Sequence, residues 1–139
     1  MPAGLPLHRL CVVQAQATEG RGVSGKGAAF ERLCQRELEA CGWLAIKSSD
    51  SSRADLIALR NESGTVRALA VEAKSGRNGC PPAQWNQHYE MCRKHGMEPV
   101  LADKVPGVAA PRWWRMTGPK SGVPGAKQPR IPFDIEAWA

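Results

Sequence analysis

A carboxylate and an ammonium group stand two residues apart at the end of an apolar run in the middle of the chain. The run "ALAV" leads directly into Glu72 and Lys74, and a second acid, Asp55, opens the preceding apolar run at 54–59. Residues i and i+2 of a strand project from the same face, about 7 Å apart. In an antiparallel pair, the start of one strand lies beside the end of the next. We therefore expect Asp55 and Glu72 at one edge of a sheet, with Lys74 one pleat further on.

Such a group of side chains suggests metal-assisted phosphodiester chemistry. Two carboxylates this close repel each other, and a cation is the usual means of keeping both ionised. Mg²⁺ is suited to the task, because it takes one or two carboxylates together with waters and phosphate oxygens. Lys74 would orient or deprotonate a water, or stabilise a phosphorane. The competing interpretation is that Glu72 and Lys74 are solvated charges at the end of a strand.

The hydrophobic pattern predicts the elements that position these residues. Helical spacing of Phe30, Leu33, Cys34 and Leu38 indicates a helix between Ser24 and Gly42. We expect strands at 43–47, 54–59, 66–74, 98–103 and 112–116, and a second helix at 83–96. This order predicts an α/β domain with a central mixed β-sheet flanked by helices. Residues 1–23 would be a flexible extension, 24–116 the domain, and 117–139 a tail rich in Pro, Gly and Lys.

Composition and charge narrow the class of partner. The formal net charge of +6 favours a polyanion. No apolar run approaches the length of a membrane span, and the N-terminus lacks the pattern of a signal peptide, so we expect a cytoplasmic protein with no membrane partner. The five cysteines form no CxxC pair and predict no disulfide framework.

A zinc site is the alternative use of one group of residues. His88, Cys92 and His95 share a face of the second helix, and Cys80 precedes it. Seven residues of helix span about 10 Å, which is too far for all three to reach one zinc ion at bond lengths of about 2 Å. A partly buried helix face is the favoured interpretation.

Three stretches of the sequence resemble a known family. "KGAAFER", "SSDSSRADLIAL" and "VEAK" resemble the archaeal-type Holliday-junction resolvases of the PD-(D/E)xK nuclease superfamily, in the family's order, and the resemblance runs from Lys26 to Arg115. ExK alone is generic to the superfamily, whereas the Lys-Gly-x-x-x-Glu-Arg opening points to resolvases. The resemblance implies a restriction-endonuclease-like fold.

The resemblance also implies roles for individual residues. Asp55 and Glu72 would bind the metal, with the backbone carbonyl of Ala73 as a candidate third ligand. Glu31 would complete the acidic cluster directly or through water, although a helix N-terminal acid is also favoured by the macrodipole. Lys74 would be the catalytic lysine.

Further positions match the family's loop and its phosphate contacts. Ser51 matches a serine in the loop before the acid, with neighbouring loop serines as alternatives. Lys26 and Arg32 match basic residues near the scissile phosphate. Lys47 stands where the family commonly has arginine, and it offers a point charge instead of a bidentate contact. Other candidates for the DNA surface are Arg53 and Arg77.

The activity that the resemblance implies is paired hydrolysis of phosphodiesters in four-way (Holliday) DNA junctions, in recombination and repair. The enzyme would be a Mg²⁺-dependent endonuclease, with Mn²⁺ able to substitute, and it would use no small-molecule cofactor. Two symmetric cuts imply a homodimer. Two alternatives stay open: another nuclease of the superfamily, restriction-like or end-processing, and a non-catalytic DNA-binding module. An intact set of acids and lysine argues against the last.

Overall fold

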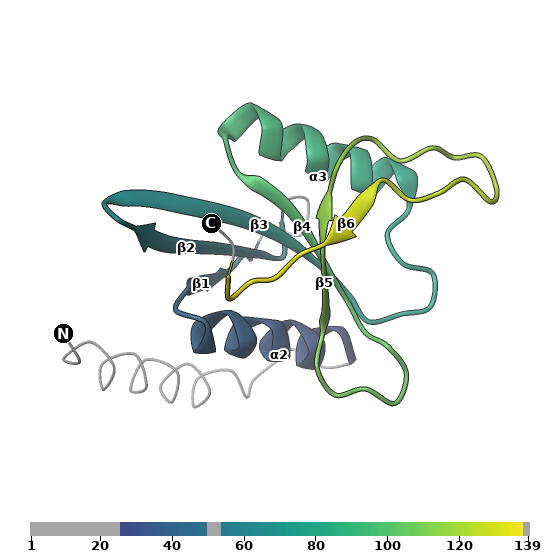
Figure 1. The fold of residues 1–139 in the computed structure, drawn as a ribbon. Coiled ribbons are helices and arrows are strands. Elements are labelled where there is room, and N and C mark those ends of the chain that lie inside the picture. Colours follow the sequence, from purple (N-terminus) through teal and green to yellow (C-terminus); the bar gives the residue numbers. More distant parts are fainter. Residues whose placement is uncertain (1–25, 50–53, 138–139) are drawn as a thin grey trace.

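A six-stranded sheet with a helix on each face forms the domain (Figure 1). The computed structural model describes residues 26–49 and 54–137. In chain order the elements are α2 (Lys26–Ala40), β1 (Leu44–Lys47), β2 (Leu56–Glu62), β3 (Thr65–Lys74), α3 (Pro82–His95), β4 (Glu98–Asp103), β5 (Arg112–Met116) and β6 (Arg130–Pro132).

The strands lie in sequence order, β1-β2-β3-β4-β5-β6, and the sheet is mixed. β3 and β4 are parallel, and the other neighbours are antiparallel. A parallel pair needs a crossover connection, and α3 provides it. The predicted α/β class, with a central mixed sheet flanked by helices, is confirmed. None of the helices in the described ranges is long and apolar enough to cross a membrane.

Side-chain alternation along β3 assigns residues to the two faces. Leu69 and Val71 join the main core under α2, where Cys34 and Leu38 are fully buried. The intervening Ala70 packs against α3. Glu72 follows the same alternation, so its carboxylate points to the α3 side. The helix that crosses from β3 to β4 therefore covers the candidate acid.

A tight turn fixes the register of the β2–β3 hairpin. Ser63 and Gly64 both have positive φ, 54° and 88°, as a two-residue type I′ turn requires. Asn61 Oδ1 accepts a hydrogen bond from the Gly64 N–H at 2.9 Å. The resulting register pairs Leu56 with Val71, and this pairing places Asp55 beside the end of β3.

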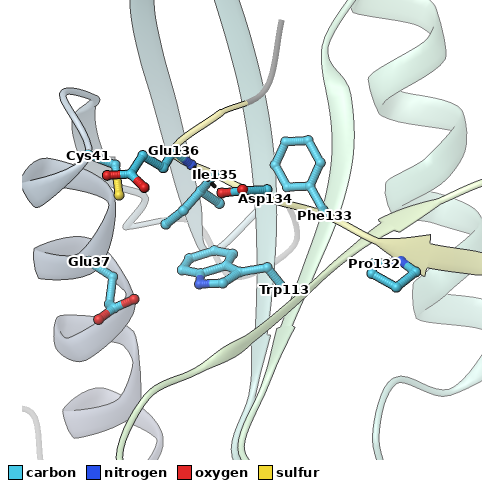
Figure 2. Close-up of a pocket in the computed structure, with 8 residues that line it drawn as sticks. All are labelled: Glu37, Cys41, Trp113, Pro132, Phe133, Asp134, Ile135 and Glu136. Atoms are coloured by element: carbon cyan, nitrogen blue, oxygen red, sulfur yellow. Dashed lines mark hydrogen bonds between the residues drawn. The ribbon is translucent and has the colours of Figure 1, made fainter.

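The C-terminal segment packs onto the domain, so the expected boundary at 116 differs from the structure. β6 extends the sheet beside β5. Beyond it, Ile135 is 5% exposed within the main core, and its carbonyl accepts a hydrogen bond from Trp43 Nε1 at 2.8 Å. Apolar contacts with the α2 side of the sheet therefore extend the packed part of the chain to Ile135. A pocket of about 500 Å³ lies between this segment and the second half of α2 (Figure 2).

Candidate active site

Asp55 and Glu72 meet where β2 begins and β3 ends. The Asp55 N–H donates to the Val71 carbonyl at 2.9 Å, and Asp55 Oδ2 accepts from the Ala73 N–H at 2.8 Å. These two bonds hold the Asp55 carboxylate against the last residues of β3. Asp55 is half-buried, whereas Glu72 is only 2% exposed. The structure thus brings together the two acids that the sequence placed at one edge of the sheet.

Gln84 links Glu72 to Lys74. Its Nε2 donates to Glu72 Oε2 at 2.8 Å, and its Oε1 accepts from Lys74 Nζ at 2.8 Å. Lys74 Nζ lies 4.0 Å from the same carboxylate oxygen. Gln84 was not among the residues predicted from the sequence. One sequence signal could have indicated it: Gln84 precedes His88 by four residues, so both lie on one face of the helix that follows the ExK strand.

His88 contacts the other oxygen of Glu72. Its Nε2 lies 2.9 Å from the Ala70 carbonyl, so this nitrogen carries the proton and donates. Nδ1 then has a lone pair, and it lies 3.5 Å from Glu72 Oε1 with no other hydrogen-bond partner in the described part of the chain. Burial lowers the pKa of His88 to about 4, so the ring is neutral at pH 7. This contact becomes a hydrogen bond only when Glu72 carries a proton.

The acids form one electrostatic group. Burial raises the pKa of Glu72 to about 7, and the charge of Asp55 adds to this effect, against the lowering by Lys74 and Gln84. Burial and Asp55 also raise the pKa of Glu31 on α2, while Lys47 and Lys74 oppose the shift. Lys47 Nζ lies 3.9 Å from Glu31 Oε1. Three carboxylates and two lysines therefore share one end of the sheet.

The donor set suits a hard divalent cation. No three His, Cys, Asp or Glu side chains of the described residues are arranged as a ready-made metal cage. Mg²⁺ needs only one or two carboxylates, because waters and phosphate oxygens complete its shell. Asp55 and Glu72 provide two, and the charge of a cation beside them would offset the desolvation and the repulsion by Asp55 that raise the pKa of Glu72. Ligation by Glu31 and by the Ala73 carbonyl stays a prediction.

The other residues predicted from the sequence for the loop and the DNA contacts lie on several elements. Lys47 ends β1 beside Glu31, and Arg32 is half-buried on α2. Arg77 is exposed in the loop between β3 and α3. Lys26 begins α2, and its side chain lies outside the described set, as do Ser51 and Arg53, which fall in the segment 50–53.

The residues of the zinc alternative are divided between different environments. His88 and Cys92 are buried on the inner face of α3, with Cys92 Sγ 3.8 Å from His88 Nε2. His95 is exposed, and Cys80 packs with Trp85 in a separate apolar cluster. The hydrogen bond to Ala70 already occupies His88 Nε2. These residues pack the helix against the sheet.

Comparison with known proteins identifies the fold. No protein family matches the chain in a family scan, and no curated protein matches it. Among solved structures, the chain is similar in its α/β fold to Hjc, a Holliday junction resolvase from the archaeal hyperthermophile Archaeoglobus fulgidus. The two share 23% sequence identity with a TM-score of 0.53, and the match covers 81% of this chain and 88% of Hjc. The likeness confirms the expected resemblance at the level of the fold.

Proposed function

We propose that this chain is a Mg²⁺-dependent endodeoxyribonuclease that resolves four-way DNA junctions by paired phosphodiester hydrolysis. One observation carries the proposal: Asp55, Glu72 and Lys74 meet at one edge of the sheet, on a fold shared with an archaeal junction resolvase. A buried acid is costly unless it is paired. Glu72 is buried, and the contacts with Gln84 and Lys74 do not offset the desolvation that raises its pKa to about 7, which favours a functional role over a purely structural one.

The proposed hydrolysis assigns a role to each of these side chains. Asp55 and Glu72 would bind Mg²⁺, which when bound stabilises charge on the phosphodiester and lowers the pKa of a water. Lys74 has its ammonium fixed by Gln84 at 4.0 Å from the Glu72 carboxylate. From there it would orient the attacking water or stabilise the negative charge on the non-bridging oxygens of the phosphorane. His88, hydrogen-bonded to Ala70, packs against the other oxygen of Glu72, with its Nδ1 3.5 Å from Oε1.

The charge of the chain supports a DNA substrate, and the proposed reaction implies a dimer. The net charge of +6 favours sequence-independent attraction to phosphates, and phosphate contacts recognise shape instead of base sequence. Resolution needs a cut in each of two opposed strands, and a two-fold dimer presents two equivalent sites.

The decisive experiment compares cleavage of a labelled four-way junction with cleavage of a linear duplex of the same sequence. Reactions contain Mg²⁺, Mn²⁺ or EDTA and use wild type, Glu72→Ala and the control Glu90→Ala, which removes an exposed acid from α3. We expect paired, metal-dependent cuts in the junction alone, lost in Glu72→Ala and kept in Glu90→Ala. Equal cutting of both DNAs would indicate a general nuclease and contradict junction resolution. Binding of the junction without cleavage under any metal condition would indicate a non-catalytic DNA-binding module.

A further inference from the structure

A second site, a basic pocket of about 390 Å³, opens beside Lys74. The loop between β3 and α3, the end of β4, the start of β5 and the C-terminal segment form its sides. Its lining contains one acid, Asp103, and six cationic residues, which are Lys74, Arg77, Lys104, Arg112, Lys120 and Arg130. No other pocket described above has this composition, and the candidate active site uses only Lys74 from the set.

The single acid is already neutralised by its neighbours. Arg112 binds Asp103 through two hydrogen bonds, 2.9 Å to Oδ1 and 2.7 Å to Oδ2. Trp114 Nε1 donates to Oδ1 at 3.1 Å, and Arg130 Nη1 lies 3.7 Å from Oδ2. Burial alone would raise the pKa of Asp103, but the bonds from Arg112 and Trp114 lower it. Asp103 therefore stays ionised and fixes two guanidinium groups in the lining of the pocket.

The C-terminal side of the pocket is rigidly placed. Trp85 Nε1 donates to the Gly118 carbonyl at 2.9 Å, and Asn86 Oδ1 accepts from the Lys120 N–H at 2.6 Å. Lys120 Nζ donates to the Cys80 carbonyl at 2.7 Å and lies 5.2 Å from the centre of the Trp85 ring. The ammonium group is thus positioned before any ligand arrives. Preorganisation of this kind reduces the entropy lost on binding.

Three cations of the pocket keep their charge available. Within the described ranges, no carboxylate forms an ion pair with Arg77, Lys104 or Lys120. Arg77 and Lys104 are also exposed. A concave site with excess positive charge favours an oxyanion, and the phosphodiester groups of a DNA backbone have the matching charge.

We infer that this basic pocket binds a backbone phosphate of the same DNA strand, next to the phosphate that is cut. The inference rests on the proposed function, because it uses Lys74 as the side shared by the two sites. One strand of duplex DNA presents a phosphate about every 3.4 Å along the helix axis, so a strand whose scissile phosphate lies at Lys74 brings neighbouring phosphates to the pocket. The C-terminal segment, through Lys120 and Arg130, would then be a DNA-binding element that adds affinity without base specificity.

The test measures binding separately from cleavage. Dissociation constants for a fluorescent four-way junction are determined in EDTA at several salt concentrations for wild type, Arg77→Glu and Lys104→Glu. Both side chains are exposed, so the variants should fold, and circular dichroism checks that they do. The matched control is Lys94→Glu in the last turn of α3, about 18 Å along the helix from its start beside the pocket.

We expect each pocket variant to weaken binding about tenfold and to reduce the slope of log K against log salt by about 1. Lys94→Glu should change either quantity far less. Wild-type affinity in both pocket variants, an equal loss in Lys94→Glu, or no DNA binding by wild type would overturn the inference. Failure to cut DNA would instead refute the proposed function, and the binding result would still decide the role of the pocket.

Discussion

At the residue scale, Gln84 makes the candidate acid and the candidate lysine into one unit. Its amide nitrogen donates to the Glu72 carboxylate and its amide oxygen accepts from the Lys74 ammonium, so both charged groups are held in place. Asp55 is fixed in a different way, by the backbone N–H of Ala73. The geometry of the site therefore depends on one side chain from α3 and on one peptide group from β3.

Replacing Gln84 with methionine should slow cleavage and shift its pH dependence. The hydrogen bond from Gln84 lowers the pKa of Glu72, so its loss raises that pKa and moves the acidic limb of the pH–rate profile to higher pH. We expect a rate about tenfold lower near neutral pH, measured in single-turnover reactions across that limb. Gln87→Met, at an exposed position of the same helix, is the control. A uniform loss of rate without a shifted limb would argue against this positioning role.

Glu72 should also make the stability of the metal-free protein depend on pH. Its pKa is about 7 in the folded chain and 4.5 ordinarily. A raised carboxyl pKa favours folding below pH 4.5, and this contribution is lost as pH rises through 7. In Glu72→Gln the charge is absent, and the amide can donate to His88 Nδ1. We expect the variant to exceed wild type at pH 8 by on the order of 3 kcal/mol, with a much smaller difference near pH 4.5.

Urea unfolding in EDTA at the two pH values measures this difference. His88 acts in the opposite direction, because its pKa falls from 6.5 to about 4 on folding and stability is lost as pH falls through that range. The comparison at each pH largely cancels this effect, since both proteins retain His88. Added Mg²⁺ should stabilise wild type at pH 8 more than the variant. An equal response of both proteins to Mg²⁺ would refute metal binding by Glu72.

At the scale of elements, local pairing was predictable and distant packing was not. Asp55 and Glu72 could be placed together because a short hairpin joins their strands and its register follows from the apolar pattern. The position of Gln84 depends on how α3 packs after a crossover, which periodicity does not specify. The pairing of β5 with β6 joins Trp114 to Pro132 across a Pro- and Gly-rich segment, and no local signal marks it.

The docking of the C-terminal segment should contribute measurably to stability. Ile135 is buried in the main core, while its carbonyl accepts from Trp43 and Arg60. Ile135→Ala removes the side chain and keeps the carbonyl, so it tests packing alone. We expect a loss of about 3 kcal/mol in the free energy of unfolding, measured by chemical denaturation. Val123→Ala, at a site 66% exposed in the same segment, should change stability by less than about 0.5 kcal/mol. Similar small effects of both substitutions would show that the segment does not support the core.

At the scale of the whole molecule, the proposed active site and the basic pocket predict one path for a phosphate backbone, because Lys74 belongs to both. In this proposal the acids where β2 begins and β3 ends lie beside the basic pocket, because Lys74 contacts Glu72 and also lines the pocket. A single chain provides one such site. The proposed paired cutting therefore requires that two chains act together on one junction, which would be a property of the assembly and not of any residue.

Mixing wild-type and Glu72→Ala chains tests this requirement. If the active species is a dimer, exchange in equal amounts leaves about a quarter of the dimers with two intact sites and about half with one. Those with one site cut a single strand, so singly nicked junctions should increase relative to resolved products. The reference is wild type diluted to half its concentration, in which every dimer keeps both sites. Chains that cut independently would give the same ratio of nicked to resolved DNA in both reactions, because an inactive chain would then only dilute the active one. A higher nicked fraction in the mixture alone would establish that the two cuts come from two sites of one assembly.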